Sequence, residues 1–385
     1  MASNLSYESL TTSRLKLDVR DEIAWKYRDE APFTTLLMNM KEKEIGTSYK
    51  REWLEGDYEA LDDTLGASYT TGDTQITVSN GSRFNKNDVI KDTDAGNVFL
   101  VTAVSSNTLT VTYCGSGSMV DSSGTDNNIM IIGSAFSIGE ARATALSTSL
   151  TNKYNYMQIH KTAFEVPNSV IAASLNGGPE LKRLTKQKLW THKLKLERAF
   201  WFGELKQLTS GGTGSNYQYF SKGVLKFLGS SNATNISDGV LTEADFWDWI
   251  RSLDSGVAGD RFLFTSPIIT AGISQWGLGK LEVSPKSKEY GVNIKVYHTP
   301  FGDFNIVNTP LFKNDYSGYA VALTMDHLTY VAMANDDKGT RDGRLETHIE
   351  DEGDDSRMDQ YLSEVTLEYR NPDKDGYLYG VSSIG

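Results

Sequence analysis

The sequence has a single cysteine and no long apolar run. Cys114 cannot form an intramolecular disulfide, and no cysteine cluster is present to hold zinc, so the fold does not depend on an oxidising compartment. No stretch of about 18 consecutive apolar residues occurs. Residues 1–10 also lack the basic start and apolar centre of a secretion signal. We therefore expect a soluble protein of cytoplasmic origin with no membrane partner.

Basic residues are outnumbered: 38 Lys and Arg stand against 50 Asp and Glu, which gives a formal net charge of -12. This charge opposes general adhesion to nucleic acid or to an anionic membrane, so any contact with a polyanion requires a local basic patch. At roughly 150 residues per domain, the 385 residues suffice for two or three packed units.

The motifs of common active sites are missing as well. The five histidines are dispersed, with no H-E-x-x-H arrangement and no neighbouring cysteine, which argues against catalytic zinc. There is no G-x-S-x-G elbow, and the glycine-rich stretches 211–214 and 277–280 lack the spacing of a phosphate-binding loop. The acidic run 350–355 lacks the alternating ligands of a calcium loop, which favours a solvated loop. We expect no enzyme activity, no catalytic residue, no metal and no cofactor.

Residues 1–45 have the character of an extended arm more than of a domain. Apolar anchors at Ile23, Trp25 and Tyr27 predict one short amphipathic turn that Pro32 stops. In the polar segment 47–58, Trp53 stands among charged residues. An exposed tryptophan there would require a partner surface.

From 61 to 134 the sequence is rich in Gly, Ser, Thr, Asn and Asp, and its apolar residues alternate in short runs. Period-two alternation between turn signals predicts four to six short strands in a small antiparallel module. Alternation returns over 154–166, which predicts the return strand of a long excursion that leaves near Thr47.

The clearest predicted helix covers 179–208. Pro179 suits its first turn, and an apolar stripe at spacings of mostly three and four follows, comprising Leu181, Leu184, Trp190, Leu194, Trp201, Leu205 and Leu208. Between Glu180 and Lys206 there are eight basic and three acidic residues, a local charge of +5. We expect the exposed face of this helix to be basic.

The remaining chain predicts an α+β unit. Thr242 with Asp245 indicates a capped helix over 243–254 with Phe246, Trp249, Ile250 and Leu253 facing a core. Strand-like stretches follow, at 261–265, 292–298, 304–308, 319–323 and 328–333, and a last one at 361–369. Residues 342–359 hold eight acids against two arginines, a local charge of -6.

In its order of parts the chain resembles the HK97-fold major capsid proteins of tailed bacteriophages, and in particular their SU10-like group. The resembling strings are TSYKREWLEGDYEAL at 47–61, the β-rich insertion at 61–134, PELKRL at 179–184, TPFG at 299–302, ALTMDHLTYVAM around Asp326, and LSEVTLEYRN at 362–371. Together they cover about 320 residues of the chain.

The resemblance implies an α+β HK97-type fold with four named parts. These are an N-terminal arm (1–46), an extended E-loop with its inserted β module (47–166, insertion about 61–134), a P domain (167–235 and 341–385, spine helix about 179–208) and an A domain (236–340). The chain starts almost directly at the arm, which implies that scaffolding is a separate protein or has already been removed. No motif marks the lysine and asparagine pair that cross-links some shells of this fold.

The function implied is a major capsid protein that builds an icosahedral head around double-stranded DNA, in hexamers and pentamers assembled in the bacterial cytoplasm. The expected partners are other copies of the chain, a scaffold or maturation protease, a portal, a cement protein, and DNA without sequence-specific contacts. We predict subunit contacts at Trp53 and between the basic residues Lys182, Arg183 and Lys186 and the acids Glu350, Asp351 and Glu352, in a neighbour or in the same chain. Two alternatives stay open: a glycan-binding or adhesive decoration protein of the virion, and a hydrolase with an unrecognised carboxylate pair.

Overall fold

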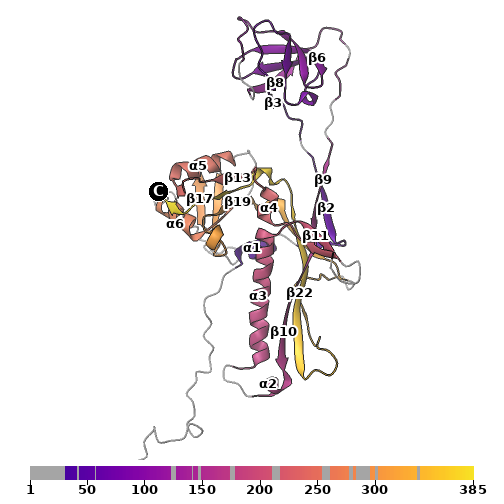
Figure 1. Cartoon of the computed structure of the whole chain (residues 1–385), viewed down its shortest axis with the longest axis vertical. Helices are drawn as coiled ribbons and strands as arrows, with labels where there is room; N and C mark the ends of the chain where they lie inside the picture. Colours follow the sequence, from indigo (N-terminus) through magenta and orange to yellow (C-terminus); the bar gives the residue numbers. More distant parts are fainter. Residues whose placement is uncertain are drawn as a thin grey trace, which may run out of the picture. The chain divides into compact units, whose positions relative to one another are not determined.

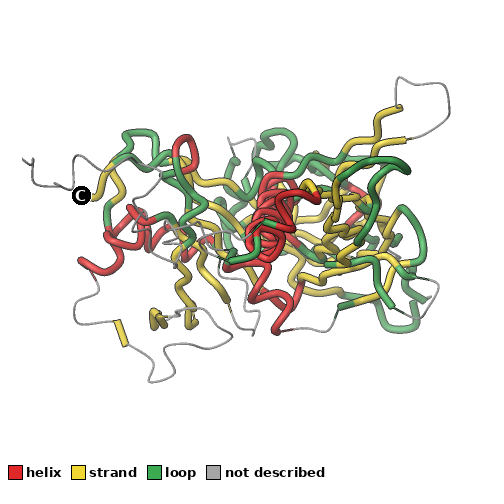
Figure 2. The backbone as a smooth tube through the Cα atoms, turned by 90° about the horizontal axis from the view of Figure 1, so that it is seen from below, coloured by secondary structure: helices red, strands yellow, loops and turns green. Residues whose placement is uncertain are grey.

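The computed structural model describes most of the chain and divides it into two compact units. The described residues are 31–40, 43–56, 58–122, 127–140, 142–145, 149–173, 178–209, 217–253, 261–276, 281–282, 295–299, 302–335 and 339–385. The main unit comprises the described residues of Met1–Trp53 and Lys153–Gly385, and the barrel unit comprises those of Leu54–Asn152 (Figure 1). Among the residues that the structure describes, strand exceeds helix, 41% against 25%, which confirms the predicted α+β class (Figure 2).

The main unit contains a five-stranded sheet. Its central strand β22 (Ser356–Tyr369) pairs antiparallel with β10 (Gln158–Pro167) on one side and with β20 (Leu328–Met333) on the other. Strand β1 (Glu44–Gly46) adds parallel to β20, and β21 (Arg344–Glu346) pairs with the first half of β22. The strands predicted at 328–333 and 361–369 are confirmed, and the last is longer than predicted. The single strand predicted at 154–166 is instead two strands, β9 (Thr151–Tyr156) and β10, which are divided at Met157 and belong to different sheets.

The longest helix, α3 (Glu180–Phe202), runs beside β10 and β22 (Figure 1). It is shorter than the predicted 179–208, because Gly203 adopts an extended conformation while its N–H bonds back to the carbonyl of Ala199. A Cβ at Gly203 would lie 2.3 Å from the carbonyl oxygen of Ser221, so the chain at this point passes closer to another segment than any side chain allows. Leu205 and Leu208 are therefore outside the helix, and Leu208 is exposed.

Helix α1 (Pro32–Met40) was not predicted from the sequence, and it begins at Pro32. Proline is tolerated in the first turn of a helix, where its missing N–H has no intrahelical partner, and here it begins the helix. Phe33, Leu36 and Leu37 are fully buried in a core cluster that also contains residues of α3, β20 and β22. The predicted turn at 23–27 lies outside the described residues.

A second sheet of the main unit has seven strands, with the order β13-β23-β19-β15-β18-β17-β16. Helix α5 (Glu243–Ser252) begins with the predicted capping box of Thr242 and Asp245 and buries Phe246, Trp249 and Ile250; helix α6 is Pro267–Trp276. The seven strands are β13 (Ala233–Asn235), β15 (Arg261–Thr265), β16 (Leu281–Glu282), β17 (Lys295–Thr299), β18 (Gly302–Asn308), β19 (Ala320–Thr324) and β23 (Gly376–Tyr379). The strands predicted from 261 to 323 are confirmed where the structure describes them.

Short elements connect these sheets. Helix α2 is Asn168–Ala172 and α4 is Val224–Leu228. Three two-stranded pairs complete the set: β2 (Lys50–Glu55) with β9 (Thr151–Tyr156), β11 (Lys206–Thr209) with β12 (Tyr217–Phe220), and β14 (Val240–Leu241) with β24 (Ser383–Ile384).

The barrel unit is a six-stranded antiparallel sheet that closes on itself. Its order is β3-β8-β5-β6-β7-β4, and the bridge between Leu65 and Val78 joins the two end strands. Closure leaves a small barrel without a free strand edge, which confirms the four to six strands predicted here. The strands are β3 (Asp62–Thr64), β4 (Gln75–Thr77), β5 (Asp88–Asp92), β6 (Val98–Ser105), β7 (Thr108–Tyr113) and β8 (Asn128–Ser134).

Candidate functional site

The exposed side of α3 is basic, as the sequence predicts. Within Glu180–Phe202 there are seven Lys and Arg against two Glu, a charge of +5. Lys182 and Lys186 are exposed, and neither forms an ion pair within the described part of the chain. Arg183 differs, because its Nε donates to Glu180 Oε2 at 2.8 Å and a second bond joins the same two side chains. That bond lowers the pKa of Glu180, so the charge of Arg183 is largely matched on its own helix.

The second glutamate of α3 has a structural role. Glu197 is fully buried, and its carboxyl oxygens accept hydrogen bonds from the backbone N–H groups of Phe33 at 3.1 Å and Thr34 at 2.7 Å, and from Trp201 Nε1 at 3.2 Å. The carboxyl group of Glu197 thus accepts hydrogen bonds from N–H groups in the first turn of α1. These N–H groups have no acceptor within the helix itself. Burial raises the pKa of Glu197. Nothing in the local sequence distinguishes this glutamate from an exposed one.

The acidic segment forms a turn between β21 and β22. Glu350 accepts hydrogen bonds from the backbone N–H of Met358 at 2.9 Å and from the ring of His348 at 3.2 Å; the Met358 bond is the larger reason that its pKa is lowered. Asp351 and Glu352 are exposed. In the described residues no ion pair joins this turn to Lys182, Arg183 or Lys186 of the same chain. The structure therefore does not bring the two predicted charged surfaces together within one copy.

Trp53 corrects the prediction of an exposed anchor. Its side chain is 8% exposed, and its ring centroid lies 6.1 Å from that of Phe227 in α4. The adjacent Glu52 is exposed on the other face of strand β2, while the aromatic partner of Trp53 is 174 positions away along the chain. The premise of a free tryptophan at a subunit contact is wrong.

Exposed apolar side chains are concentrated in the barrel unit, a feature that the sequence interpretation missed. Sixteen large apolar residues are exposed in the described part of the chain. Eight of them belong to the barrel unit, which holds about a quarter of the chain: Leu54, Tyr58, Leu61, Val120, Ile132, Phe136, Ile138 and Leu150. Tyr58 is 99% exposed and Ile138 is 108% exposed.

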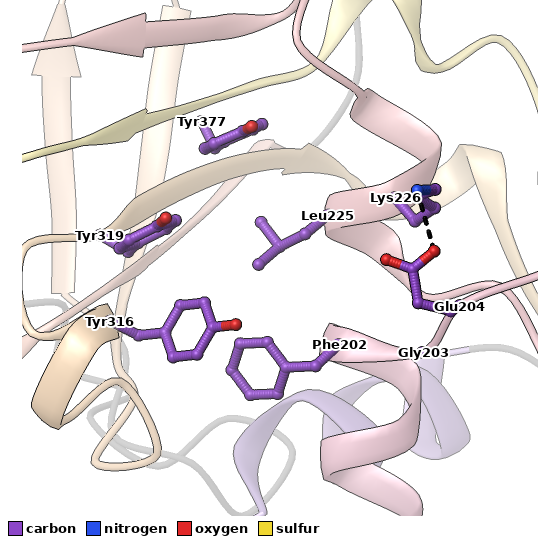
Figure 3. Close-up of a pocket in the computed structure, with 8 residues that line it drawn as sticks. All are labelled: Phe202, Gly203, Glu204, Leu225, Lys226, Tyr316, Tyr319 and Tyr377. Atoms are coloured by element: carbon purple, nitrogen blue, oxygen red, sulfur yellow. Dashed lines mark ion pairs between the residues drawn. The ribbon is translucent and has the colours of Figure 1, made fainter.

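A small pocket lies at the end of α3 (Figure 3). It has a volume of about 210 Å³, and its lining includes Phe202, Leu225, Tyr316, Tyr319 and Tyr377. At its rim, Lys226 pairs with Glu204 at 2.8 Å, so neither charge is free to act on a substrate. The volume is below that of typical ligand pockets, roughly 300–1,000 Å³.

The described residues contain no group of three His, Cys, Asp or Glu placed to hold a metal ion. Cys114 is exposed and free. The glycine-rich stretches 211–214 and 277–280 lie outside the described residues. Among the helices that the structure describes, none combines the length and apolar character needed to cross a bilayer.

Comparison with solved structures defines the class. The capsid asymmetric unit of cyanophage A-1(L) matches 96% of this chain and 98% of its own, at 12% identity and a TM-score of 0.53. The structures described as Mycobacterium phage Bobi and Mycobacterium phage Adephagia match at 9% identity with TM-scores of 0.49 and 0.48, over 98% and 100% of this chain and 99% of each of theirs. The fold is that of the HK97-type phage capsid proteins.

The family follows from the sequence. The SU10 major capsid protein family matches residues 3–382, and the chain belongs to this family. It is a major capsid protein that forms the shell of a phage head. No curated protein matches the chain. Membership of this family means that the principal role of the chain is neither that of a decoration protein nor that of a hydrolase.

Proposed function

We propose that this protein assembles into a closed icosahedral shell of hexamers and pentamers that encloses double-stranded DNA, and that it carries no enzymatic activity. The observation that supports this proposal is the family match over residues 3–382. A scaffold or maturation protease, a portal and a cement protein are the further partners proposed, with assembly in the bacterial cytoplasm.

The proposal assigns the named parts of the fold to this chain. Residues 1–46 are the N-terminal arm, 47–166 the E-loop, 167–235 and 341–385 the P domain, and 236–340 the A domain. The barrel unit lies within the E-loop range, and α3 is the spine helix of the P domain. Closed point-group assembly then repeats the same modest contacts many times, which makes the shell cooperative although each contact is weak.

We also propose an electrostatic contact between copies. Lys182 and Lys186 are exposed and unpaired in the described structure, and Asp351 and Glu352 are exposed on the acidic turn. Arg183 and Glu350 belong to the same surfaces, but they already have partners within the chain. Pairing across a subunit boundary therefore depends mainly on Lys182, Lys186, Asp351 and Glu352.

Electron microscopy of the full-length chain, alone and with its candidate scaffold, tests the assembly proposal. We expect closed shells, and a chain that stays monomeric under every salt and scaffold condition would contradict it. The contact is tested by the Lys182→Glu/Lys186→Glu double variant, for which we expect a lower shell yield than for the wild type. The control is Lys374→Glu, an exposed lysine outside α3. Normal yield and unchanged salt tolerance of the double variant would refute the contact.

A further inference from the structure

A buried histidine of α3 joins this helix to two strands of the five-stranded sheet. His192 is 1% exposed. Its ring Nδ1 lies 3.1 Å from the hydroxyl oxygen of Thr162 in β10, and its Nε2 lies 2.9 Å from that of Ser363 in β22. Thr162 and Ser363 are themselves buried. The ring therefore connects the middle of α3 to both strands through hydrogen bonds that are shielded from water.

A second histidine lies on the same face of the sheet. In the pairing of β10 with β22, His160 is directly opposite Ser363. Thr162, two residues along the same strand, is opposite Tyr361, whose ring centroid lies 6.0 Å from that of His192. Alternate residues of a strand share one face, so His160 lies on the face that contacts His192. His160 is half-buried, and its Nε2 is a buried nitrogen without a hydrogen-bond partner in the described residues.

The hydrogen bonds around His192 require a neutral ring. Ser363 Oγ donates its only proton to Asp342 Oδ1 at 2.9 Å, so His192 Nε2 is the donor to Ser363. Nδ1 then accepts from the hydroxyl of Thr162 and carries no proton. The same hydroxyl oxygen accepts from Lys195 Nζ at 3.4 Å. A proton added at Nδ1 would break the bond as it stands and leave two cationic donors facing one oxygen.

The charged groups near His192 come from the elements packed against it. Lys195 lies on α3 itself, and His160 becomes a second cation if it is protonated. Asp342, before β21, is the neighbouring anion, but its side chain is 3% exposed and already forms an ion pair with Lys43. Burial lowers the pKa of His192 more than Asp342 raises it, and Lys195 lowers it further. The other titratable side chains of this cluster are tyrosines that burial keeps uncharged by raising their pKa, Tyr330 of β20 and Tyr361 of β22.

We infer that His192 and His160 form a proton-sensitive lock between α3 and the sheet, here called the histidine lock. With both rings neutral, His192 holds α3 against β10 and β22. When α3 separates from the sheet, both rings reach water and can take up protons, and a protonated His192 cannot form the same bonds again. Acid therefore favours the separated helix. The role of the lock in a shell rests on the proposed function, because α3 also carries the lysines of the proposed contact between copies.

Hydrogen exchange of the full-length wild type tests the lock in unassembled chains. Exchange is measured at pH 7 and at pH 5 and corrected for the intrinsic effect of pH on each amide. Below the ordinary histidine pKa of ~6.5, each proton taken up on opening shifts the opening equilibrium by up to about tenfold per pH unit. We expect the protection of α3 amides to fall at least about tenfold, while the buried strand β15 keeps its protection. Unchanged protection of α3, or equal loss in β15, would overturn the inference.

Variants without a titrating ring identify the groups responsible. The amide of His192→Gln still offers a donor and an acceptor but does not titrate, and His160→Gln/His192→Gln removes both rings. We expect the pH dependence of α3 exchange to decrease in the single variant and to disappear in the double variant. The matched control is His348→Gln, because His348 is an exposed histidine of the acidic turn, and it should keep the dependence of the wild type. A double variant with the dependence of the wild type would contradict the lock.

Nuclear magnetic resonance of the wild-type histidine rings decides the matter if the double variant does not fold. The chain has five histidines, so each ring signal is assigned from a single variant. We expect the His192 ring to stay neutral for as long as α3 remains protected. Protonation of His192 near pH ~6.5 with α3 still protected would overturn the inference.

The outcomes for the lock and for the proposed function are separate. If shells never form, the proposed function fails, and the exchange experiment still decides whether the lock exists. If shells form, we expect less salt to dissociate them at pH 5 than at pH 7, and the double variant should lose this difference. The same pH difference in shells of the wild type and of the double variant would overturn the role of the lock in the shell.

Discussion

The barrel unit and the main unit reach a folded state in different ways. In the barrel unit the side-chain hydrogen bonds join residues of the insertion itself, as in Tyr69 with Asp92 at 2.6 Å, 23 positions apart, and Asn87 with Glu140 at 2.8 Å, 53 positions apart. In the main unit several buried bonds join distant residues, as in Thr34 with Glu197 at 2.7 Å, 163 positions apart. The barrel has its own core and no free edge, whereas the core of the main unit needs chain from both sides of the insertion.

The two units also differ in charge. Residues 58–140 hold ten acids and three bases, a charge of -7, so more than half of the net charge of -12 lies in about a fifth of the chain. Helix α3 has a charge of +5. Negative charge is therefore concentrated in the barrel unit, and positive charge is concentrated on α3 of the main unit. Such segregation gives copies of an acidic protein attractive surfaces.

The strongest test of independence between the units removes the centre of the barrel core. Phe99 is 1% exposed and lies between Tyr69, at 5.6 Å, and Tyr113, at 5.8 Å. Phe99→Ala should destabilise the barrel by about 3–5 kcal/mol through lost burial and the cavity left behind. Hydrogen exchange should show faster exchange in 58–140 and unchanged exchange in α3 and β22. Equal loss of protection in both units would show that they fold as one cooperative unit. The neutral control is Ile132→Ala, because the Ile132 side chain is 51% exposed.

The reciprocal test acts on the main unit. Glu197→Ala leaves the N–H groups of Phe33 and Thr34 and the indole of Trp201 without their acceptor. We therefore expect the free energy of unfolding to fall by about 3 kcal/mol. Exchange should rise first in α1. Glu197→Gln keeps one carbonyl acceptor and should fall between the alanine variant and the wild type. An alanine variant as stable as the wild type would mean that the cap has no energetic role.

The two units should also differ, by a smaller amount, in how their stability changes as the pH falls. Burial lowers the pKa of His160 to about 4, helped by the charges of His192 and Lys195. Between pH 4 and its unfolded value near ~6.5, the unfolded chain binds more protons, so the main unit loses stability as the pH falls through this range, by no more than about 3 kcal/mol. The barrel unit has no histidine. Its Glu140, whose pKa Asn87 and other donors lower to about 2, keeps its contribution until the pH falls below ~4.5.

Exchange measured in each unit from pH 7 to pH 4 checks this order. The main unit should lose protection first, and His160→Gln should reduce its pH dependence. Simultaneous loss in both units, or an unchanged dependence in the variant, would contradict the assignment to His160.

Sequence patterns predicted those helices and strands whose conformation is determined by residues within the same segment. The strands of 61–134 follow from alternation, and α5 follows from Thr242 and Asp245, which bond each other as a capping box. The basic face of α3 follows from composition and period. In each case the informative residues are within a few positions of one another.

The predictions that failed depend on contacts between distant segments. Helix α3 ends at Phe202 because Gly203 approaches Ser221, and Trp53 is buried because α4 supplies Phe227. The cap from Glu197 to α1 and the stacking of Tyr49 on Tyr219 likewise join segments that only the fold brings together. The spacing of residues in the sequence predicts the secondary structure of each segment. It does not predict which distant segments come into contact.

Strand β3 begins the barrel and β8 ends it, and the two are hydrogen-bonded neighbours, with Asp62 opposite Met130. An insert whose entry and exit are adjacent can be deleted and replaced by a short turn without moving the chain on either side. A virus could thus gain, lose or exchange this module by a single recombination event while the lattice of its head stays the same. The same property makes the barrel a natural position for grafting a foreign domain.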